Sequence, residues 1–297
     1  MEEKIPEVGA ATVDFYRQTL NGFLQFLGER ASAEISSIER SDIINYRALL
    51  AKRLSAKTVN HRTKTLRLVF EFAVRQRHIW QNPAAFVKAV RNNEPRVRRP
   101  FTLDEVRKLL EIADPEWQTL IKLGLYTGQR LGDLVRLTWG DVDFDRELIT
   151  LTTAKTRRRL IIPMARPLLE HLRRYLNSRV LIPEMPVHPK SFKMLKNAHG
   201  GVVTLSNHFG NLLAECGLRT KKPHHIIVAD GRDGRRVRYE LSFHCFRHTA
   251  VSILKEAGVP QSVVMELIGH YSEQVSAMYT HTGLEALKKA AAALPEV

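Results

Sequence analysis

Apolar side chains recur at helical spacing through the first third of the chain. In VDFYRQTLNGFLQFL (residues 13–27) and LRLVFEFAV (residues 66–74) the apolar positions lie three or four residues apart, as on one face of an amphipathic helix. Ser41-Asp42 is typical of a helix start, and Asn82-Pro83 predicts a short last helix. Residues 11–90 therefore predict a compact unit of four or five helices.

The pattern restarts after Phe101-Thr102, where helices and strands alternate. ELITLTTAKTRRRLIIPM (residues 147–164) predicts a strand pair, and HIIVADGRDGRRVRYEL (residues 225–241) predicts a second, longer hairpin with Asp-Gly turns. Gly258 is placed to end one of the last helices, and Pro260 opens the next. The remaining helices are expected at 103–113, 115–126, 130–137, 165–178 and 205–216.

Between the two patterns, RNNEPRVRRP (residues 91–100) has no periodicity, two prolines and four arginines. These features predict a positively charged linker. The chain is thus expected to form a helical domain at 1–90, a basic linker at 91–100 and a mixed α/β domain at 101–297. The fold class is mainly α with a small β component.

The formal charge of +15 on 297 residues narrows the class of partner. Such a positive charge favours a polyanion as partner. Nucleic acid is the first candidate and an anionic membrane surface the second, and the alternative is that the charge serves only solubility. Cys216 and Cys245 sit in apolar helical patterns and are expected to be free thiols in a reducing compartment. A polar N-terminus and the lack of an apolar run of ~18 residues predict a cytoplasmic protein without a membrane span.

Two basic residues in the second pattern are candidates for chemistry. Arg130 follows a Thr-Gly turn and precedes an amphipathic segment, and Asp133 is spaced to hold its guanidinium by an ion pair. Lys155 lies near the tip of the first hairpin. Taken singly, each is more often an exposed, solvated residue.

The last sixty residues contain the other candidates. His244 and Arg247 are three residues apart, so they project from one helical face. His270 follows a helix end, and Tyr279 comes nine residues later. Each of these is weak evidence alone, since histidine and tyrosine commonly pack in helices.

The set and its order are specific. Thr-Gly-x-Arg, Lys-Thr in a hairpin, His-x-x-Arg-His, Gly-His and Tyr-x-His resemble, in that order, the tyrosine recombinase (phage integrase) family. TVNHRTKTLRLVFEFAVRQRHIWQNP also resembles the helical core-binding (SAM-like) domain of that family. The resemblance implies a C-shaped clamp around DNA, with residues 1–90 as core-binding domain and 101–297 as tyrosine-recombinase catalytic domain.

The resemblance also implies a site that cuts DNA by direct attack on phosphorus. Two guanidiniums would stabilise the charge on the non-bridging oxygens, a lysine would protonate the leaving 5′-oxygen, and the tyrosine would form a 3′-phosphotyrosyl link. Tyr271 is expected to pack or to stay exposed. No metal, ATP or other cofactor is expected, because the chain has no Walker-type loop and no acidic metal cluster. The expected catalytic residues are Arg130, Lys155, His244, Arg247, His270 and Tyr279.

The expected partner is double-stranded DNA carrying a specific recombination site, in the cytoplasm and on the nucleoid. A homotetramer on DNA and a monomer without it are expected, with LEALKKAAAAL (residues 284–294) as an exchange helix that packs onto a neighbouring protomer. The alternative for this helix is that it closes its own domain. Two other functions stay open: a type IB topoisomerase-like strand nicker and a DNA-binding accessory protein that does not cut.

Two departures from the family pattern bear on function. Residues 219–241 are longer than in compact members, and they form either a lineage-specific hairpin or a basic finger that touches DNA or a neighbouring subunit. This length favours a mobile-element integrase. The turn after Lys155 lacks the glycine often found there and carries arginines instead, which predicts a stiffer tip.

Overall fold

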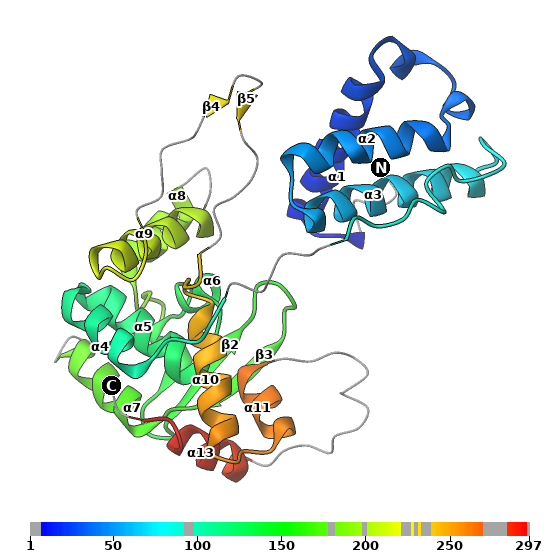
Figure 1. Cartoon of the computed structure of the whole chain (residues 1–297). Coiled ribbons are helices and arrows are strands. Elements are labelled where there is room, and N and C mark those ends of the chain that lie inside the picture. The colour runs from blue at the N-terminus through cyan, green and yellow to red at the C-terminus, as the bar shows by residue number, and fades with distance from the viewer. Residues whose placement is uncertain are drawn as a thin grey trace. The chain divides into compact units, whose positions relative to one another are not determined.

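The computed structural model describes residues 7–91, 98–177, 182–197, 201–220, 227–228, 231–232, 239–269 and 284–295. It is mainly helical with a small sheet, as the sequence predicts (Figure 1). The chain divides into two compact units. The first comprises Met1–Arg96 with Pro223–Val237, and the second comprises Val97–Lys222 with Arg238–Val297.

In the first unit, three α-helices pack around an aromatic and aliphatic core. Ser55 caps the third helix by accepting a hydrogen bond from the backbone N–H of Thr58. The second helix begins with a capping box between Glu39 and Asp42, next to the start that the sequence predicts. The helical elements are α1 (Ala10–Leu27), α2 (Arg40–Arg53) and α3 (Ala56–Arg75), with 3₁₀ turns η2 (Gly28–Ser32) and η3 (Ile35–Ser37).

The short helix predicted from Asn82-Pro83 is wrong, because residues 83–86 form a turn. Side chains of the segment and of α3 bind the backbone groups that a helix would pair internally. Arg67 donates from Nε to Ala84 O (3.0 Å) and from Nη2 to Val87 O (3.0 Å), and the Asn82 side chain accepts from Ala84 N (2.9 Å). The segment is therefore fastened to α3 in an irregular path.

The second unit contains most of the described helices, and the starts of α4 and α5 follow from local caps. Thr102 and Glu105 form a capping box, and Asp114 accepts from Trp117 N (2.9 Å) ahead of Pro115. The α-helices are α4 (Leu103–Ile112), α5 (Pro115–Thr127), α6 (Leu131–Leu134), α7 (Arg166–Leu176), α8 (Pro189–Asn197), α9 (Val202–Glu215), α10 (Cys245–Glu256), α11 (Gln261–Ile268) and α13 (Leu284–Ala292).

Three of these helices differ from the prediction by three residues or more, and one of them, α9, begins at Val202 and not at the predicted 205. Helix α6 ends at Leu134, three residues before the predicted end at 137. Helix α8 was not predicted, since its cap comes from elsewhere in the chain. The buried carboxylate of Glu116 accepts hydrogen bonds from Lys190 N (2.8 Å) and Ser191 N (3.0 Å) at the start of α8.

The predicted strand pair is part of a three-stranded antiparallel sheet in the order β1 (Val142–Asp143), β2 (Leu148–Thr152) and β3 (Arg159–Pro163). Leu151 pairs with Leu160 and Ile149 with Ile162, so the buried faces of both strands match. In the longer predicted hairpin, β4 (Ile227–Val228) and β5 (Gly231–Arg232) pair antiparallel. A 3₁₀ turn, η4 (Trp139–Asp141), leads into β1.

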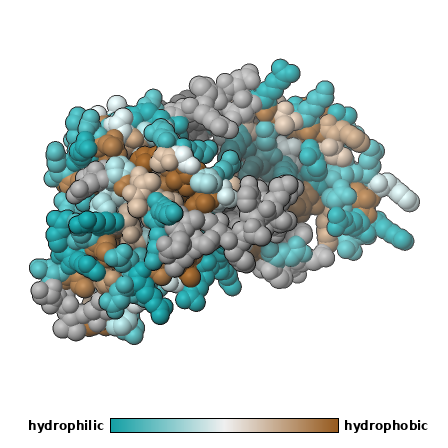
Figure 2. All heavy atoms as spheres, turned by 90° about the horizontal axis from the view of Figure 1, so that it is seen from below, coloured by the Kyte–Doolittle hydropathy of each residue, from teal (hydrophilic) through white to brown (hydrophobic). Residues whose placement is uncertain are grey.

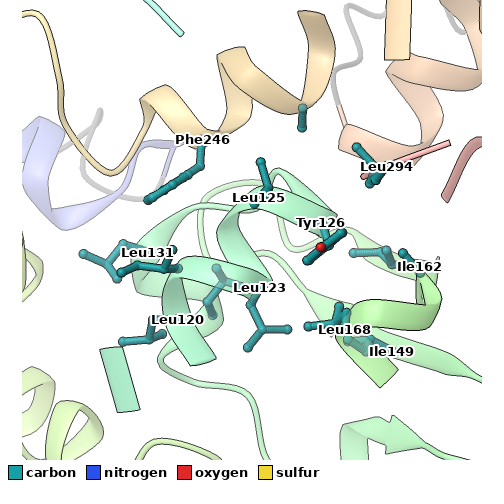
Figure 3. Close-up of a cluster of buried hydrophobic side chains, with 14 of the residues drawn as sticks. Leu120, Leu123, Leu125, Tyr126, Leu131, Ile149, Ile162, Leu168, Phe246 and Leu294 are labelled. Atoms are coloured by element: carbon teal, nitrogen blue, oxygen red, sulfur yellow. The ribbon is translucent and has the colours of Figure 1, made fainter. Parts of the chain in front are cut away.

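Helix α5 runs through the core of the second unit. Figure 3 shows its leucines facing side chains from several elements, with Leu125 opposite Phe246 of α10 and Tyr126 beside Ile162 and Leu294. The Tyr126 hydroxyl donates to Pro295 O (2.6 Å). Helix α13 is thus packed against its own domain, the second of the two arrangements considered for it; exchange onto a neighbour stays a prediction.

One face of the molecule is largely polar. The face seen in Figure 2 is covered largely by hydrophilic side chains, with hydrophobic ones in small groups between them. Both cysteines are free, and Cys245 is buried. In the described part of the chain, no helix has the length and apolar character needed to cross a membrane, and no cluster of three or more His, Cys, Asp or Glu could hold a metal ion.

Candidate active site

The turn between α5 and α6 holds Arg130 in place. Gly128 has φ +62°, and a Cβ there would lie 2.4 Å from Ile268 Cδ1, so only glycine fits. The buried Gln129 amide donates to Thr127 O (3.0 Å) and to Ile268 O (3.2 Å). Arg130 is the N-cap residue of α6. This turn is therefore locked to the C-terminal end of α11, about 140 residues further along the sequence.

Asp133 connects Arg130 to the β2–β3 hairpin. Its carboxylate is 5% exposed. Oδ1 accepts a hydrogen bond from Ala154 N (2.9 Å), and Oδ2 lies 3.9 Å from Arg130 Nη1. The predicted ion pair with Arg130 is thus present at long range. The carboxylate also fixes the backbone next to Lys155.

Lys155 is exposed in the turn between β2 and β3. Thr153 N donates to Arg158 O (2.9 Å), and Arg157 N donates to Thr153 O (2.8 Å), which closes the turn. Arg157 has φ +52°, in the left-handed region. The glycine expected from the family pattern is replaced here by an arginine at a position where glycine would be free of steric cost.

Arg247 projects from the first turn of α10 into the protein and is 3% exposed. Its Nη1 donates to Gly128 O (2.9 Å), whereas Nε and Nη2 find no hydrogen-bond acceptor among the described residues. Burial, and then the Arg130 guanidinium, lower the pKa of Arg247 to about 10, and Asp133 opposes this shift. The guanidiniums of Arg130 and Arg247 are therefore close together, and Arg247 has two buried N–H donor groups that are unpartnered among the described residues.

His244 is the N-cap residue of α10. The residue is exposed as a whole, but its ring is partly surrounded by protein atoms. This partial burial lowers the pKa of His244 to about 4, and the positive charge of Arg247 lowers it further. His248, Arg98 and Arg130 are further causes of the shift. The imidazole is therefore neutral at pH 7, so one ring nitrogen can accept a proton or a hydrogen bond.

His270 and Tyr279 lie outside the described residues, as does Tyr271. The residue before His270 is described: Gly269 has φ +71°, and a Cβ there would lie 2.9 Å from Leu160 Cδ1 on β3. The described candidates are brought to one place. Arg130, His244 and Arg247 converge, and the hairpin that carries Lys155 is fastened to them through Asp133.

Four residues that support this site were not singled out from the sequence. Gly128 and Gln129 lie inside the Thr-Gly-x-Arg motif, whose glycine was the available signal. His248 directly follows Arg247, and Arg98 lies in the stretch interpreted as linker. Their roles depend on contacts between distant parts of the chain, and no local pattern encodes those contacts.

Comparisons with known proteins agree with this arrangement. Residues 99–285 match the model of the phage integrase family, and residues 7–77 match that of the phage integrase N-terminal SAM-like domain. Tyrosine recombinase XerC of Listeria innocua serovar 6a is 27% identical over 284 residues, which cover 92% of this chain and 87% of the relative.

Two solved structures share the fold. The Tn1549 transposon integrase in complex with circular intermediate DNA is 21% identical with a TM-score of 0.65, over 97% of this chain and 95% of that one. A lambda integrase tetramer bound to a Holliday junction is 20% identical with a TM-score of 0.65, over 91% and 72%. The sequence-based prediction of the family and the fold is confirmed.

Proposed function

Because this chain belongs to the phage integrase family of tyrosine recombinases, we propose that it cuts and rejoins duplex DNA at a specific site through a covalent link to Tyr279. The protein is an enzyme that breaks and reseals DNA strands. The observation that carries the proposal is the pair Arg130 and Arg247. Two like charges held together, with buried N–H groups unpartnered in the described structure, are unfavourable without an anion, and a DNA phosphate supplies one.

In this mechanism the scissile phosphate occupies the space in front of the two arginines. Their guanidiniums donate to the non-bridging oxygens, where negative charge builds up in the transition state. Arg247 is preorganised, since Gly128 O already binds its Nη1 (2.9 Å). The arginines supply the charge neutralisation, so the scheme needs neither metal nor ATP.

The bond changes then balance without a co-reactant. The Tyr279 oxygen bonds to phosphorus, the bond from phosphorus to the 5′-oxygen breaks, and Lys155 donates a proton to that oxygen. The tyrosine proton passes to one imidazole, that of His244 or that of His270. The pKa of His244 is about 4 without DNA, so its imidazole is unprotonated at pH 7, and the negative charge of a bound phosphate favours its protonated form. A 5′-hydroxyl from another strand reverses the step.

The same proposal covers how the protein binds and assembles on DNA. Residues 1–90 form the core-binding domain and residues 101–297 the catalytic domain, and the two domains grip the duplex in the cytoplasm. Four copies assemble on two DNA sites, as the lambda integrase tetramer does on its junction. Without DNA the protein is a monomer, in keeping with helix α13 packed on its own domain.

The decisive experiment traps protein on a suicide duplex whose nicked product diffuses away. Tyr279→Phe keeps the ring and removes the attacking oxygen, so DNA binding stays near wild type and the covalent adduct vanishes. Tyr271→Phe is the matched control and still forms the adduct, and a chelator leaves the wild-type yield unchanged.

An adduct that survives in Tyr279→Phe and is lost in Tyr271→Phe would overturn the assignment of the nucleophile. Absence of an adduct from the wild-type protein would favour a binding protein that does not cut. Religation of marked duplexes without exchange between them would favour a topoisomerase-like nicker.

A further inference from the structure

The end of the linker is bound along the first turns of α10. Arg99 N donates to Glu240 O (3.3 Å), and Arg99 Nε lies 3.1 Å from Glu240 Oε2. Two residues on, Phe101 N donates to Thr249 Oγ1 (2.8 Å), and the Phe101 ring stacks on Phe246 with centroids 4.5 Å apart. Residues 98–101 are therefore a fixed strap within the second unit.

This strap brings Arg98 next to two histidines of α10. His244 and His248 lie one helical turn apart, and their ring centroids are 5.5 Å apart at an interplanar angle of 85°. Both residues are exposed. The Arg98 guanidinium contributes to lowering the pKa of each. Arg98, His244 and His248 thus form one cluster that borders the two arginines of the candidate active site.

Arg98 and its neighbour Arg99 differ in how their charges are compensated. Arg99 binds Glu105 through Nη2 (2.6 Å) and Glu240 through Nε (3.1 Å), so its charge is compensated within the protein. Arg98 is exposed, and within the described part of the chain no carboxylate forms an ion pair with it. Arg99 fastens the strap, whereas the Arg98 guanidinium is available to an external anion.

We propose that Arg98 and His248 form a second phosphate-binding site, which holds a DNA backbone phosphate one or two nucleotides from the reacting phosphate. Four residues along an α-helix span ~6 Å, and phosphates of one strand are spaced ~3.4 Å along the DNA axis. If His244 contacts the scissile phosphate, His248 reaches its neighbour on the same strand. The site would fix the DNA register over the catalytic residues. It rests on the proposed function.

The test measures coupling between a protein side chain and a single phosphate. Duplexes carrying one neutral methylphosphonate at each of about three positions on either side of the cleavage site are titrated with wild type, Arg98→Ala and His248→Ala. Arg146→Ala is the matched control, because this residue is exposed and precedes β2, at the opposite end of the strand from the turn with Lys155.

We expect one methylphosphonate position near the scissile phosphate to weaken wild-type binding about tenfold, as for a charged hydrogen bond. Arg98→Ala should weaken binding to unmodified DNA about tenfold and show no further loss at that position. His248→Ala should show the same coupling with a smaller loss. Arg146→Ala should respond to every methylphosphonate as the wild type does.

Equal losses in wild type and Arg98→Ala at every position would overturn the site, as would wild-type affinity of Arg98→Ala for unmodified DNA. Covalent adduct on the suicide duplex is measured in parallel with the wild type. A wild type that forms no adduct contradicts the proposed function, whereas the coupling is a binding measurement and tests the Arg98 site separately.

Discussion

At the scale of single residues, Arg130 and Arg247 differ in burial, so their substitution should separate catalysis from stability. Arg247→Ala removes a hydrogen bond to Gly128 O and the packing of a side chain that is 3% exposed, which outweighs the relieved repulsion with Arg130, so the free energy of unfolding should fall by about 1–3 kcal/mol. Arg130→Ala should cost little stability, because its side chain is 39% exposed and its removal relieves repulsion with Arg247. Both should reduce cleavage by about 10²–10³-fold.

Urea unfolding and the adduct gel, run on both variants, measure the two effects. Equal loss of stability in Arg130→Ala and Arg247→Ala would show that burial is not the difference between them. Near-normal cleavage in either variant would remove that arginine from the site.

The burial of His188 predicts that the protein loses stability in mild acid. The residue is 0% exposed, and its burial lowers its pKa to about 3 from an ordinary 6.5. Below pH 6.5 the unfolded chain takes up a proton that the folded one does not, so the stability present above pH 6.5 is lost as pH falls.

Replacing His188 removes one source of this acid sensitivity. The wild-type protein should lose free energy of unfolding when the pH falls from 6.5 to 5. In His188→Leu this loss should be smaller by ~2 kcal/mol. His78→Leu, an exposed histidine of the first unit, should keep the wild-type difference. An unchanged pH dependence in His188→Leu would mean that other groups carry the acid response.

The residue scale also shows what the sequence could and could not predict. The types and order of Arg130, Lys155, His244 and Arg247 predict the site because they match the motifs of the tyrosine recombinase family and suit cleavage at a phosphate. The contacts that hold them do not follow from any local pattern. Arg247 binds a carbonyl 119 residues earlier in the chain, and such pairs become neighbours only in the tertiary structure.

At the scale of elements, the tip of the β2–β3 hairpin contains an arginine in a glycine-like conformation. Arg157 has φ +52°, which costs a residue with a Cβ roughly 1 kcal/mol. Arg157→Gly should therefore raise the free energy of unfolding by up to about 1 kcal/mol. Arg159→Gly is the matched control, because it removes the same side chain from strand β3, where glycine destabilises.

Thermal and urea unfolding of the two glycine variants decide between these outcomes. If Arg157→Gly destabilised the protein as much as Arg159→Gly, the turn would not be strained. The hairpin also links to mechanism, since Lys155 lies two residues before Arg157. A more flexible tip should change the cleavage rate without changing the affinity for DNA.

Local caps mark the starts of two helices that the sequence predicted. Helix α4 has Thr102 and Glu105 within one turn, and α5 has Asp114 before Pro115. Helix α8 was missed because its cap, Glu116, lies more than 70 residues earlier. The helix expected after Asn82 failed because Arg67 binds the carbonyls of that segment. In each case a contact between distant residues decided the outcome.

At the scale of the whole molecule, the net charge of +15 predicts how DNA binding responds to salt. Each phosphate contact made by a lysine or arginine releases condensed counterions, so log K falls with log salt by about 0.9 per contact. A protein making six to ten such contacts loses ~10³–10⁵ in affinity between 50 and 200 mM salt. We expect the wild-type protein to fall in this range on any duplex, because backbone contacts do not read sequence.

The slope also offers a check on which charges face DNA. Arg98→Ala should lower it by about 1, since one phosphate contact is lost. Arg146→Ala removes the same formal charge from an exposed turn at the far end of β2 and should leave the slope unchanged. Binding measured by anisotropy at five salt concentrations gives the slopes. A wild-type affinity that does not change with salt would contradict a clamp built on phosphate contacts. Equal salt slopes for Arg98→Ala and Arg146→Ala would mean that the net charge of the protein, and not the position of each charge, sets the affinity for DNA.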